Sequence, residues 1–179
     1  MSTSDPVSIR AGRASDAAAI RKLLVTVASS DGNLARAADE MTEEYVDDFV
    51  SASLADGVLL VAELAGISGI AGELHAYRNG IRRFAHVLGG LTVAVHPEAQ
   101  GRGIGRRLFE VLLDDVRRNR PMIERIELIT SESNVRARKL YESLGFRQQG
   151  RFERGILSPR GELEADIPMA WLRDEKPSP

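Results

Sequence analysis

Three glycines alternate with other residues near the middle of the chain: Gly101, Gly103 and Gly105. An apolar stretch, 91–95, precedes them, and an amphipathic stretch follows them. Glycine lets several backbone N–H groups approach one anion without hindrance from a Cβ atom. The start of a helix adds N–H groups without intrahelical partners and the positive end of the helix dipole. With arginines at positions 102, 106 and 107 as well, the segment predicts a site for a phosphate group.

Two common glycine-rich phosphate loops do not match this segment. The Walker loop ends in Gly-Lys-Ser/Thr, where this chain has Gly105, Arg106 and Arg107. The dinucleotide fingerprint needs glycine where Arg106 stands, and it normally lies near the start of a βαβ unit. A glycine-rich turn that binds no ligand remains the alternative, because such turns are common.

The elements around this segment alternate between strand and helix periodicity, which predicts an α/β or α+β domain. Hydrophobic spacing and turn residues predict strands at 7–11, 57–64, 67–77, 84–95, 125–130, 146–151 and 164–172. The same patterns predict four helices, at 15–28, from 42 onward, at 103–118 and at 134–144. The second of these is expected to bury Phe49 and Leu54 among other apolar residues. A crossover helix in the second half implies at least one parallel pair of strands.

Two glycine-containing pairs carry further expectations. Asn79–Gly80 is the pair favoured in a tight two-residue hairpin, so we expect the strands on either side to be antiparallel neighbours. Gly89–Gly90, inside a predicted strand, suggests a bulge or a close backbone approach.

Length and composition restrict the class of protein. The chain has 179 residues, of which 43% are hydrophobic and 28% charged, as in one soluble domain. A net charge of -2 argues against nucleic acid as the main partner. The absence of cysteine excludes disulfides and thiol catalysis, and three isolated histidines give no metal-site spacing, so no metal is expected.

The ends of the chain are polar and contain proline. We expect disordered tails at 1–6 and 174–179 around a single domain at 7–173. The polar start has no signal-peptide pattern, and no apolar run approaches the roughly 18 residues of a membrane span. These features predict a cytoplasmic protein that does not associate with a membrane.

Two segments resemble the cofactor motifs of the GCN5-related N-acetyltransferase (GNAT) superfamily. Gln100-x-x-Gly103-x-Gly105, after the strand that ends near 95, resembles its acetyl-CoA motif. The segment 134–146, from Asn134 through Tyr141 to Gly145, resembles its second cofactor motif at the expected distance downstream. The order of the predicted elements over 7–173 also follows the family. The resemblance implies an α/β (α+β) fold with a mixed, mostly antiparallel central sheet of about six to seven strands and about four flanking helices.

The resemblance also implies how acetyl-CoA is bound. The backbone of Val93, Ala94 and Val95 is expected to pair with the pantetheine arm as an additional strand would. The pyrophosphate is expected to lie against the backbone of the turn residues Gln100, Gly101, Arg102, Gly103, Ile104, Gly105 and Arg106. Asn134 is a good helix cap from its residue type alone, and its family position adds a hydrogen bond to the pantetheine.

The catalytic roles follow from the chemistry of acyl transfer to an amine. Tyr141 is expected to protonate the departing thiolate, although its place on a helix stripe also fits a core aromatic residue. A carboxylate or an imidazole must take a proton from the acceptor ammonium. Glu73 and His86 are the first candidates, and His75 and Glu127 are the others. Because side chains alternate between the two faces of a strand, their position along the strand decides which of them face the cleft. A bulge at Gly89–Gly90 would reverse this alternation for the residues beyond it. A fifth polar residue, His96, is expected to belong to the turn before Pro97.

The function implied is transfer of an acetyl group from acetyl-CoA to a primary amine of a small molecule, such as an amino acid or a polyamine, by direct attack in a ternary complex. Two alternatives stay open: acetylation of protein N-termini or lysines, and a regulatory module that binds acyl-CoA without turnover. An acidic cluster in 39–48 is either a solvated helix face or a surface that attracts cationic amines. The oligomeric state stays open, and a symmetric homodimer is the commonest outcome for such chains.

Overall fold

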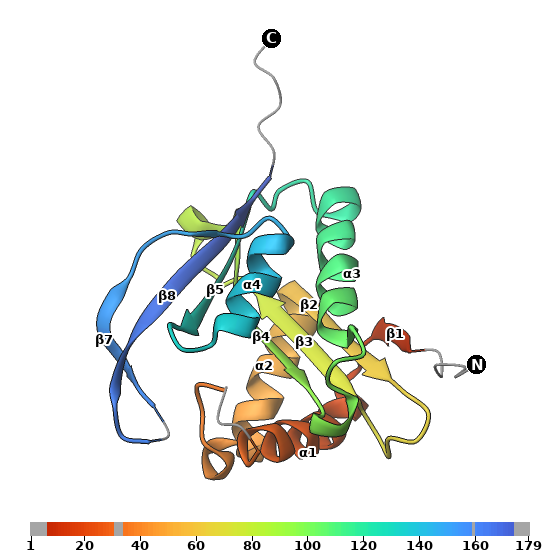
Figure 1. Ribbon diagram of the computed structural model, residues 1–179. Helices are drawn as coiled ribbons and strands as arrows, with labels where there is room; N and C mark the ends of the chain where they lie inside the picture. The colour runs from red at the N-terminus through yellow and green to blue at the C-terminus, as the bar shows by residue number, and fades with distance from the viewer. Residues whose placement is uncertain (1–6, 31–33, 159, 174–179) are drawn as a thin grey trace, which may run out of the picture. The chain divides into compact units, whose positions relative to one another are not determined.

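The computed structural model describes residues 7–30, 34–158 and 160–173 (Figure 1). The two tails expected to be disordered lie outside these residues. The described residues group into two compact units. The first unit takes its residues from Met1–Tyr77 and Leu91–Leu112, and the second from Arg78–Gly90 and Leu113–Pro179.

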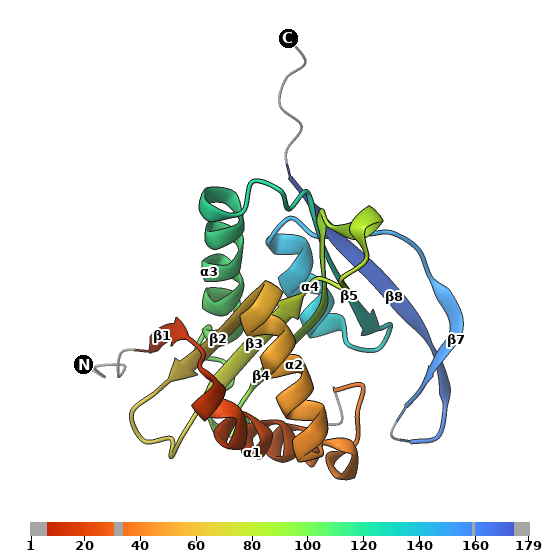
Figure 2. The same ribbon diagram turned by 180° about the vertical axis from the view of Figure 1, so that it is seen from behind.

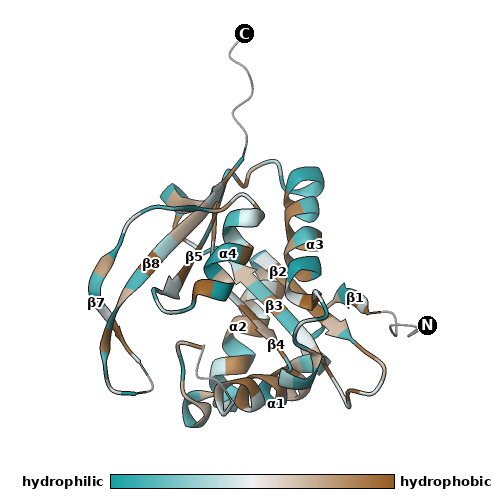
Figure 3. Cartoon of the chain, in the orientation of Figure 1, coloured by the Kyte–Doolittle hydropathy of each residue, from teal (hydrophilic) through white to brown (hydrophobic). Residues whose placement is uncertain are grey.

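The first unit contains β1 to β3, α1 and α2, together with the end of β4 and the start of α3. Their bounds are β1 Ser8–Ala11, α1 Ala17–Ala28, α2 Glu43–Asp56, β2 Gly57–Glu63, β3 Gly72–Tyr77, β4 Val87–Val95 and α3 Ile104–Asn119. Strand β2 is antiparallel to both β1 and β3, and β4 is the other neighbour of β3. Helix α3 alternates hydrophilic and hydrophobic residues, as an amphipathic helix does (Figure 3).

Helices α1 and α2 supply most of the core of the first unit. Helix α2 lies across β2 and β3 (Figure 2). The buried cluster combines apolar residues from both helices, the strands and the loops beside them, namely Ile20, Leu23, Leu24, Val27, Met41, Val46, Phe49, Val50, Leu59, Val61, Ile70 and Ala94. The prediction that Leu54 is buried was wrong: its side chain is 47% exposed, whereas Phe49, Val46 and Val50 of the same helix are buried.

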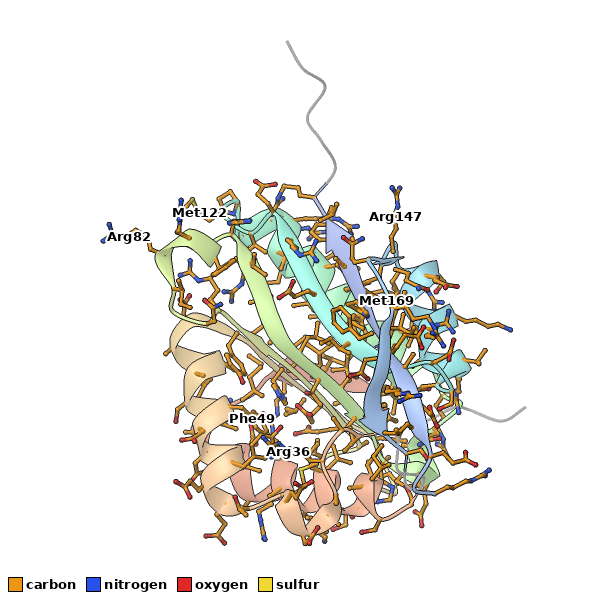
Figure 4. All side chains as sticks on the ribbon, turned by 90° about the vertical axis from the view of Figure 1, so that its left-hand side faces the viewer. Arg36, Phe49, Arg82, Met122, Arg147 and Met169 are labelled. Atoms are coloured by element: carbon orange, nitrogen blue, oxygen red, sulfur yellow. The ribbon has the colours of Figure 1, made fainter. Side chains whose placement is uncertain are left out.

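The second unit contains the remaining strands and α4. Their bounds are β5 Arg125–Ser131, α4 Val135–Ser143, β6 Arg147–Gln148, β7 Phe152–Leu157 and β8 Leu163–Leu172. The start of β4 is parallel to β5, which confirms the predicted parallel pair. Strands β6 and β7 both pair with β8, which is also antiparallel to β5, and β5 and β8 lie side by side in Figure 4. On β5, Ile126 and Leu128 are buried opposite Trp171 and Met169 of β8.

The strand order is β1-β2-β3-β4-β5-β8-β6, with β7 beside β8. The expectation of a mixed, mostly antiparallel sheet with four helices is confirmed for the described residues, with eight strands in place of six to seven. No helix in the described part of the chain has both the length and the hydropathy needed to cross a membrane.

The hairpin predicted at Asn79–Gly80 was wrong. Strand β3 ends at Tyr77, and β4 begins ten residues later, at Val87, after the short helical turn Arg82–Phe84. The Asn79 side-chain oxygen accepts a 3.0 Å hydrogen bond from the Ile81 N–H, which closes a local turn. Arg78 then donates to the Ala85 carbonyl oxygen at 3.0 Å, and this bond holds the wider loop together.

The strand predicted at 146–151 was also wrong in extent. Strand β6 covers only Arg147–Gln148, and a further strand, β7, follows at Phe152–Leu157. The register with β8 shifts between Phe152 and Ile156, and Arg154 has a positive φ of 55°. This irregularity gives the segment no clear alternation from which a strand could be predicted.

Candidate active site

The glycine turn is anchored to the neighbouring strand of the first unit. The His96 N–H, directly after β4, donates a 2.9 Å hydrogen bond to the Ala71 carbonyl oxygen, directly before β3. A short helical turn, Pro97–Ala99, follows, and the His96 ring nitrogen Nδ1 accepts from the Glu98 N–H at 3.3 Å. His96 therefore belongs to the turn, as the sequence predicted.

Two of the three glycines have backbone angles that favour glycine. Gly101 and Gly103 have φ values of 77° and 76°, in the left-handed region. No atom lies within 4 Å of a Cβ added at either position, so the backbone conformation and not crowding explains these glycines. Gly105 lies inside α3, where the Arg107 N–H donates to the Gly103 carbonyl oxygen at 3.1 Å.

Close packing fixes the start of α3 against β3 and β4. A Cβ added at Gly72 would lie 2.9 Å from the Ile104 Cγ2 atom and 3.3 Å from both the Ala94 carbonyl oxygen and the Leu108 Cδ1 atom. Glycine is therefore required at position 72 for the helix to approach the strands this closely. Ala94 is buried, whereas Val93 and Val95 on either side are half-buried.

This turn fits the pyrophosphate expected from the sequence. Two left-handed glycines lead into a helix start, which leaves backbone N–H groups without intrahelical partners. Arg102 and Arg106 are exposed on the same segment and add positive charge. The residues from Val93 to Arg106 that the sequence predicts to bind the cofactor all lie in the first unit.

A buried acid–imidazole pair lies on β3 in the same unit. The Nδ1 atom of His75 is 3.1 Å from the Oε2 atom of Glu73, and the two residues are 2% and 0% exposed. The other carboxylate oxygen of Glu73, Oε1, has no hydrogen-bond partner among the described residues. The sequence indicated both residues as candidates for the general base, but their hydrogen bond to each other was not predicted. Their spacing of two on a strand, which places side chains on one face, was the available signal.

The other two base candidates lie in the second unit. His86 is exposed and lies in the turn before β4, not at the start of that strand as the sequence suggested. Its carbonyl oxygen accepts hydrogen bonds from the Glu124 and Arg125 N–H groups at 3.0 and 3.2 Å. Glu127 is exposed on β5, where it pairs with Arg125 at 2.9 Å. A left-handed residue, Gly90 with a φ of 57°, lies within β4 next to Gly89.

The second cofactor motif forms α4 in the second unit. The Asn134 side chain caps this helix by accepting a 3.3 Å hydrogen bond from the Ala137 N–H. Tyr141 is 8% exposed, and burial raises the pKa of its phenol to about 12. The hydroxyl is therefore protonated at neutral pH, which is the form that a proton donor needs.

The acidic cluster around the start of α2 is exposed. Its members are Asp39, Glu40, Glu43, Glu44, Asp47 and Asp48. This exposure agrees with a solvated helix face, and attraction of a cationic amine stays a prediction. The described residues contain no group of three or more His, Cys, Asp or Glu side chains placed to hold a metal ion.

Comparisons with known proteins identify a family. Residues 55–148, just over half of the chain, match the family model described as an acetyltransferase (GNAT) domain. The mycothiol acetyltransferase of Beutenbergia cavernae is 46% identical over 55 residues, which are 31% of this chain and 18% of that protein. The chain therefore matches less than a fifth of the length of this curated relative.

Solved structures share the fold over nearly the whole chain. A GNAT-family acetyltransferase from Streptococcus pneumoniae has a TM-score of 0.83 at 23% identity, covering 94% of this chain and 100% of its own. The yncA protein of Salmonella typhimurium, solved with its cofactor acetyl-CoA, has a TM-score of 0.81 at 22% identity, covering 97% and 98%. The ribosomal-protein-alanine N-acetyltransferase of Brucella melitensis has a TM-score of 0.79 at 21% identity, covering 93% and 99%.

The matched region extends from the last turn of α2 through β6, so it contains the glycine turn, the cap of α4 and Tyr141. The family match agrees with the sheet order, the four helices and the turn geometry described above. This chain belongs to the acetyltransferase (GNAT) family.

Proposed function

We propose that this enzyme transfers the acetyl group of acetyl-CoA to a primary amine of a small molecule, such as an amino acid or a polyamine. The observation that carries the proposal is the buried carboxylate of Glu73. It lies on β3, the strand next to β4, in the same unit as the glycine turn. A carboxylate with one oxygen lacking a partner can take a proton from an acceptor ammonium.

The residues that would hold acetyl-CoA come from both motifs. The backbone of Val93 to Val95 would pair with the pantetheine arm, the turn Gln100 to Arg106 would hold the pyrophosphate, and Asn134 would add a side-chain hydrogen bond. When bound, acetyl-CoA supplies the acetyl group and a thiolate leaving group.

Two side chains would move the protons. Glu73 Oε1 accepts one proton from the acceptor ammonium, which frees the nitrogen lone pair to form the bond to the acetyl carbon. The Tyr141 hydroxyl gives one proton to the sulfur as the carbon–sulfur bond breaks. The nitrogen loses its second proton as the amide forms, and a proton returned to the Tyr141 phenolate restores the starting state. The chain has no cysteine, so a cysteinyl acyl-enzyme cannot form, and the proposed transfer is a direct attack in a ternary complex. His86, exposed and in the other unit, is the weaker candidate for the base.

The relatives differ in the acceptors that their names state. One is a mycothiol acetyltransferase, named for a small molecule, and another is a ribosomal-protein-alanine N-acetyltransferase. We favour a small molecule because the C-terminal segment 154–169, which begins Arg-Gly-Ile-Leu and ends Asp-Ile-Pro-Met, is similar to that of the amino-acid and small-amine branches of the family. A homodimer is part of the same proposal, and light scattering of the purified chain tests it.

The test is release of CoA thiol across a panel of amino acids, polyamines, aminoglycosides and peptides with free N-termini, with the acetylated product identified by mass spectrometry. The proposal expects turnover with at least one small amine and little with peptides. Turnover with peptides alone would favour protein acetylation. Tight CoA binding without thiol release for any acceptor would favour a regulatory module.

The role of Glu73 has its own matched pair of variants. Glu73→Gln keeps the shape of the side chain but removes its charge, and should lower kcat on the order of a hundredfold. Glu63→Gln makes the same change at an exposed carboxylate of the same unit and should alter kcat little. Full activity of Glu73→Gln would exclude Glu73 as the base.

A further inference from the structure

The pair formed by Glu73 and His75 has a defined hydrogen-bond direction when Glu73 is ionised. A carboxylate only accepts hydrogen bonds, so the Nδ1 atom of His75 must carry the proton that spans the 3.1 Å to Oε2. Both side chains are buried. The pairing therefore fixes the protonation of one ring nitrogen as well as the position of one carboxylate oxygen.

Aromatic packing holds the imidazole of His75 in place. The Phe49 ring is stacked on it with a centroid separation of 3.8 Å and an angle of 13° between the planes. The Tyr77 ring is nearly parallel to it at 6.3 Å. Phe49 and Arg36 are both labelled in Figure 4. The Arg36 guanidinium lies 4.1 Å from the ring centroid of Tyr45, which lies on α2 with Phe49. Because Phe49 belongs to the core of the first unit, the imidazole is held by the packing of α2 on β3.

The neighbouring strand β2 places apolar residues opposite Glu73 and His75. The partner residue of Glu73 on β2 is Val61, and that of His75 is Leu59, both of which are buried apolar residues. An ionised carboxylate in such a place is costly unless it is hydrogen-bonded. The structure gives it one bond, at Oε2, and leaves Oε1 without a partner among the described residues.

We infer that His75 is a positioning residue, which holds Glu73 by Oε2 so that Oε1 is presented to the ammonium group of the acceptor. This inference rests on the proposed function, because it assigns the two oxygens separate roles in taking the acceptor proton. The proton moves from the ammonium nitrogen to Oε1, and the Nδ1 proton stays on His75. Glu73 later releases its proton to solvent, which restores the starting state.

Two substitutions separate positioning from packing. His75→Phe keeps an aromatic ring for Phe49 and Tyr77 but has no donor. His75→Asn loses the ring, but its side-chain amide can donate from nearly the place of Nδ1. Positioning predicts that His75→Phe lowers kcat about tenfold or more with an unchanged KM for acetyl-CoA, and that His75→Asn recovers most of the loss. A role in packing alone predicts the reverse order of the two variants.

A double variant tests whether His75 acts through Glu73. In the Glu73→Gln background, adding His75→Phe should lower kcat no further, because the side chain that His75 holds can no longer take a proton at its other oxygen. Independent, multiplying losses would overturn the inference. If Glu73→Gln alone keeps full activity, the proposed function of Glu73 fails. If Glu73→Gln is impaired but His75→Phe is fully active, only the role of His75 fails.

A measurement without turnover tests the hydrogen bond itself. Nitrogen-15 NMR of the imidazole rings, assigned with the His75→Phe protein among only three histidines, reports which nitrogen carries the proton. We expect a protonated Nδ1 at neutral pH and a changed Nδ1 signal in Glu73→Gln. An unprotonated Nδ1 in the native protein would overturn the inference.

Discussion

The Phe146 N–H donates a 3.0 Å hydrogen bond to the carbonyl oxygen of Tyr141, and the ring centroids of the two residues are 6.1 Å apart. Gly145, just before Phe146, has a φ of 93°. This left-handed conformation ends α4 and directs the chain back toward the last helical turn of α4. Tyr141 is thus held by the backbone and by ring packing. Its position does not depend on the hydroxyl group alone.

Replacement of Tyr141 by Phe should therefore preserve the fold and remove only the proton donor. We expect kcat to fall on the order of a hundredfold, because loss of a general acid usually costs that much. The Kd for CoA should change little, because the proton is needed only as the carbon–sulfur bond breaks. Steady-state kinetics, calorimetry with CoA and a melting curve check these three expectations. Full kcat in a protein with native stability would show that Tyr141 is only a core aromatic residue.

The ionisation of Tyr141 gives a separate prediction. Burial disfavours the charged phenolate, which raises the pKa to about 12 from an ordinary value near 10. At about pH 10.5 the native protein and Tyr141→Phe should have the same phenolate absorbance, because Tyr141 is still protonated. In guanidinium chloride at the same pH, the native sequence has three titrating tyrosines and Tyr141→Phe has two. The phenolate absorbance of the unfolded native chain should therefore be the higher of the two. The same difference in folded and unfolded protein would contradict the burial of this hydroxyl.

Features set by neighbouring residues could be predicted from the sequence. The glycine turn and the Asn134 cap depend on residues a few positions apart, and both are present. The spacing of Glu73 and His75 places them on one face of a strand, but their burial under Phe49 could not be predicted, because it depends on how α2 packs on β3. The hairpin at Asn79–Gly80 failed because bonds from side chains of the loop stabilise a longer connection.

The stability of the first unit should depend on the ion pair between Arg10 and Asp16. Two guanidinium nitrogens of Arg10 donate to the two carboxylate oxygens of Asp16 at 2.8 and 3.0 Å, and the Arg13 N–H donates to the same carboxylate. These bonds hold the pKa of Asp16 below its usual range. Asp16→Asn should lower the free energy of unfolding by about 1 kcal/mol at neutral pH.

The pH dependence of the stability lost in Asp16→Asn follows from the direction of the pKa shift of Asp16. A folded pKa below the unfolded value stabilises the protein above the unfolded pKa, and the stabilisation disappears as the pH falls through the folded pKa. Urea titrations should therefore give a smaller difference between the two proteins at about pH 3 than at neutral pH. Asp114→Asn is the control, because Asp114 forms only exposed pairs on α3, and its effect should be near zero. An equal loss for Asp16→Asn at both pH values would contradict the assignment.

The binding of acetyl-CoA at the glycine turn is tested most directly by calorimetry with CoA on two matched variants. Gly103 and Gly66 have φ values of 76° and 87°, and no atom lies within 4 Å of an added Cβ at either position. Substitution by Glu therefore imposes similar backbone strain at both sites, but only at Gly103 does it bring a negative charge to the expected pyrophosphate. Gly103→Glu should weaken CoA binding by about a hundredfold or more, and Gly66→Glu should leave it unchanged. Native CoA affinity in a folded Gly103→Glu protein would contradict the assignment of this turn as the cofactor site.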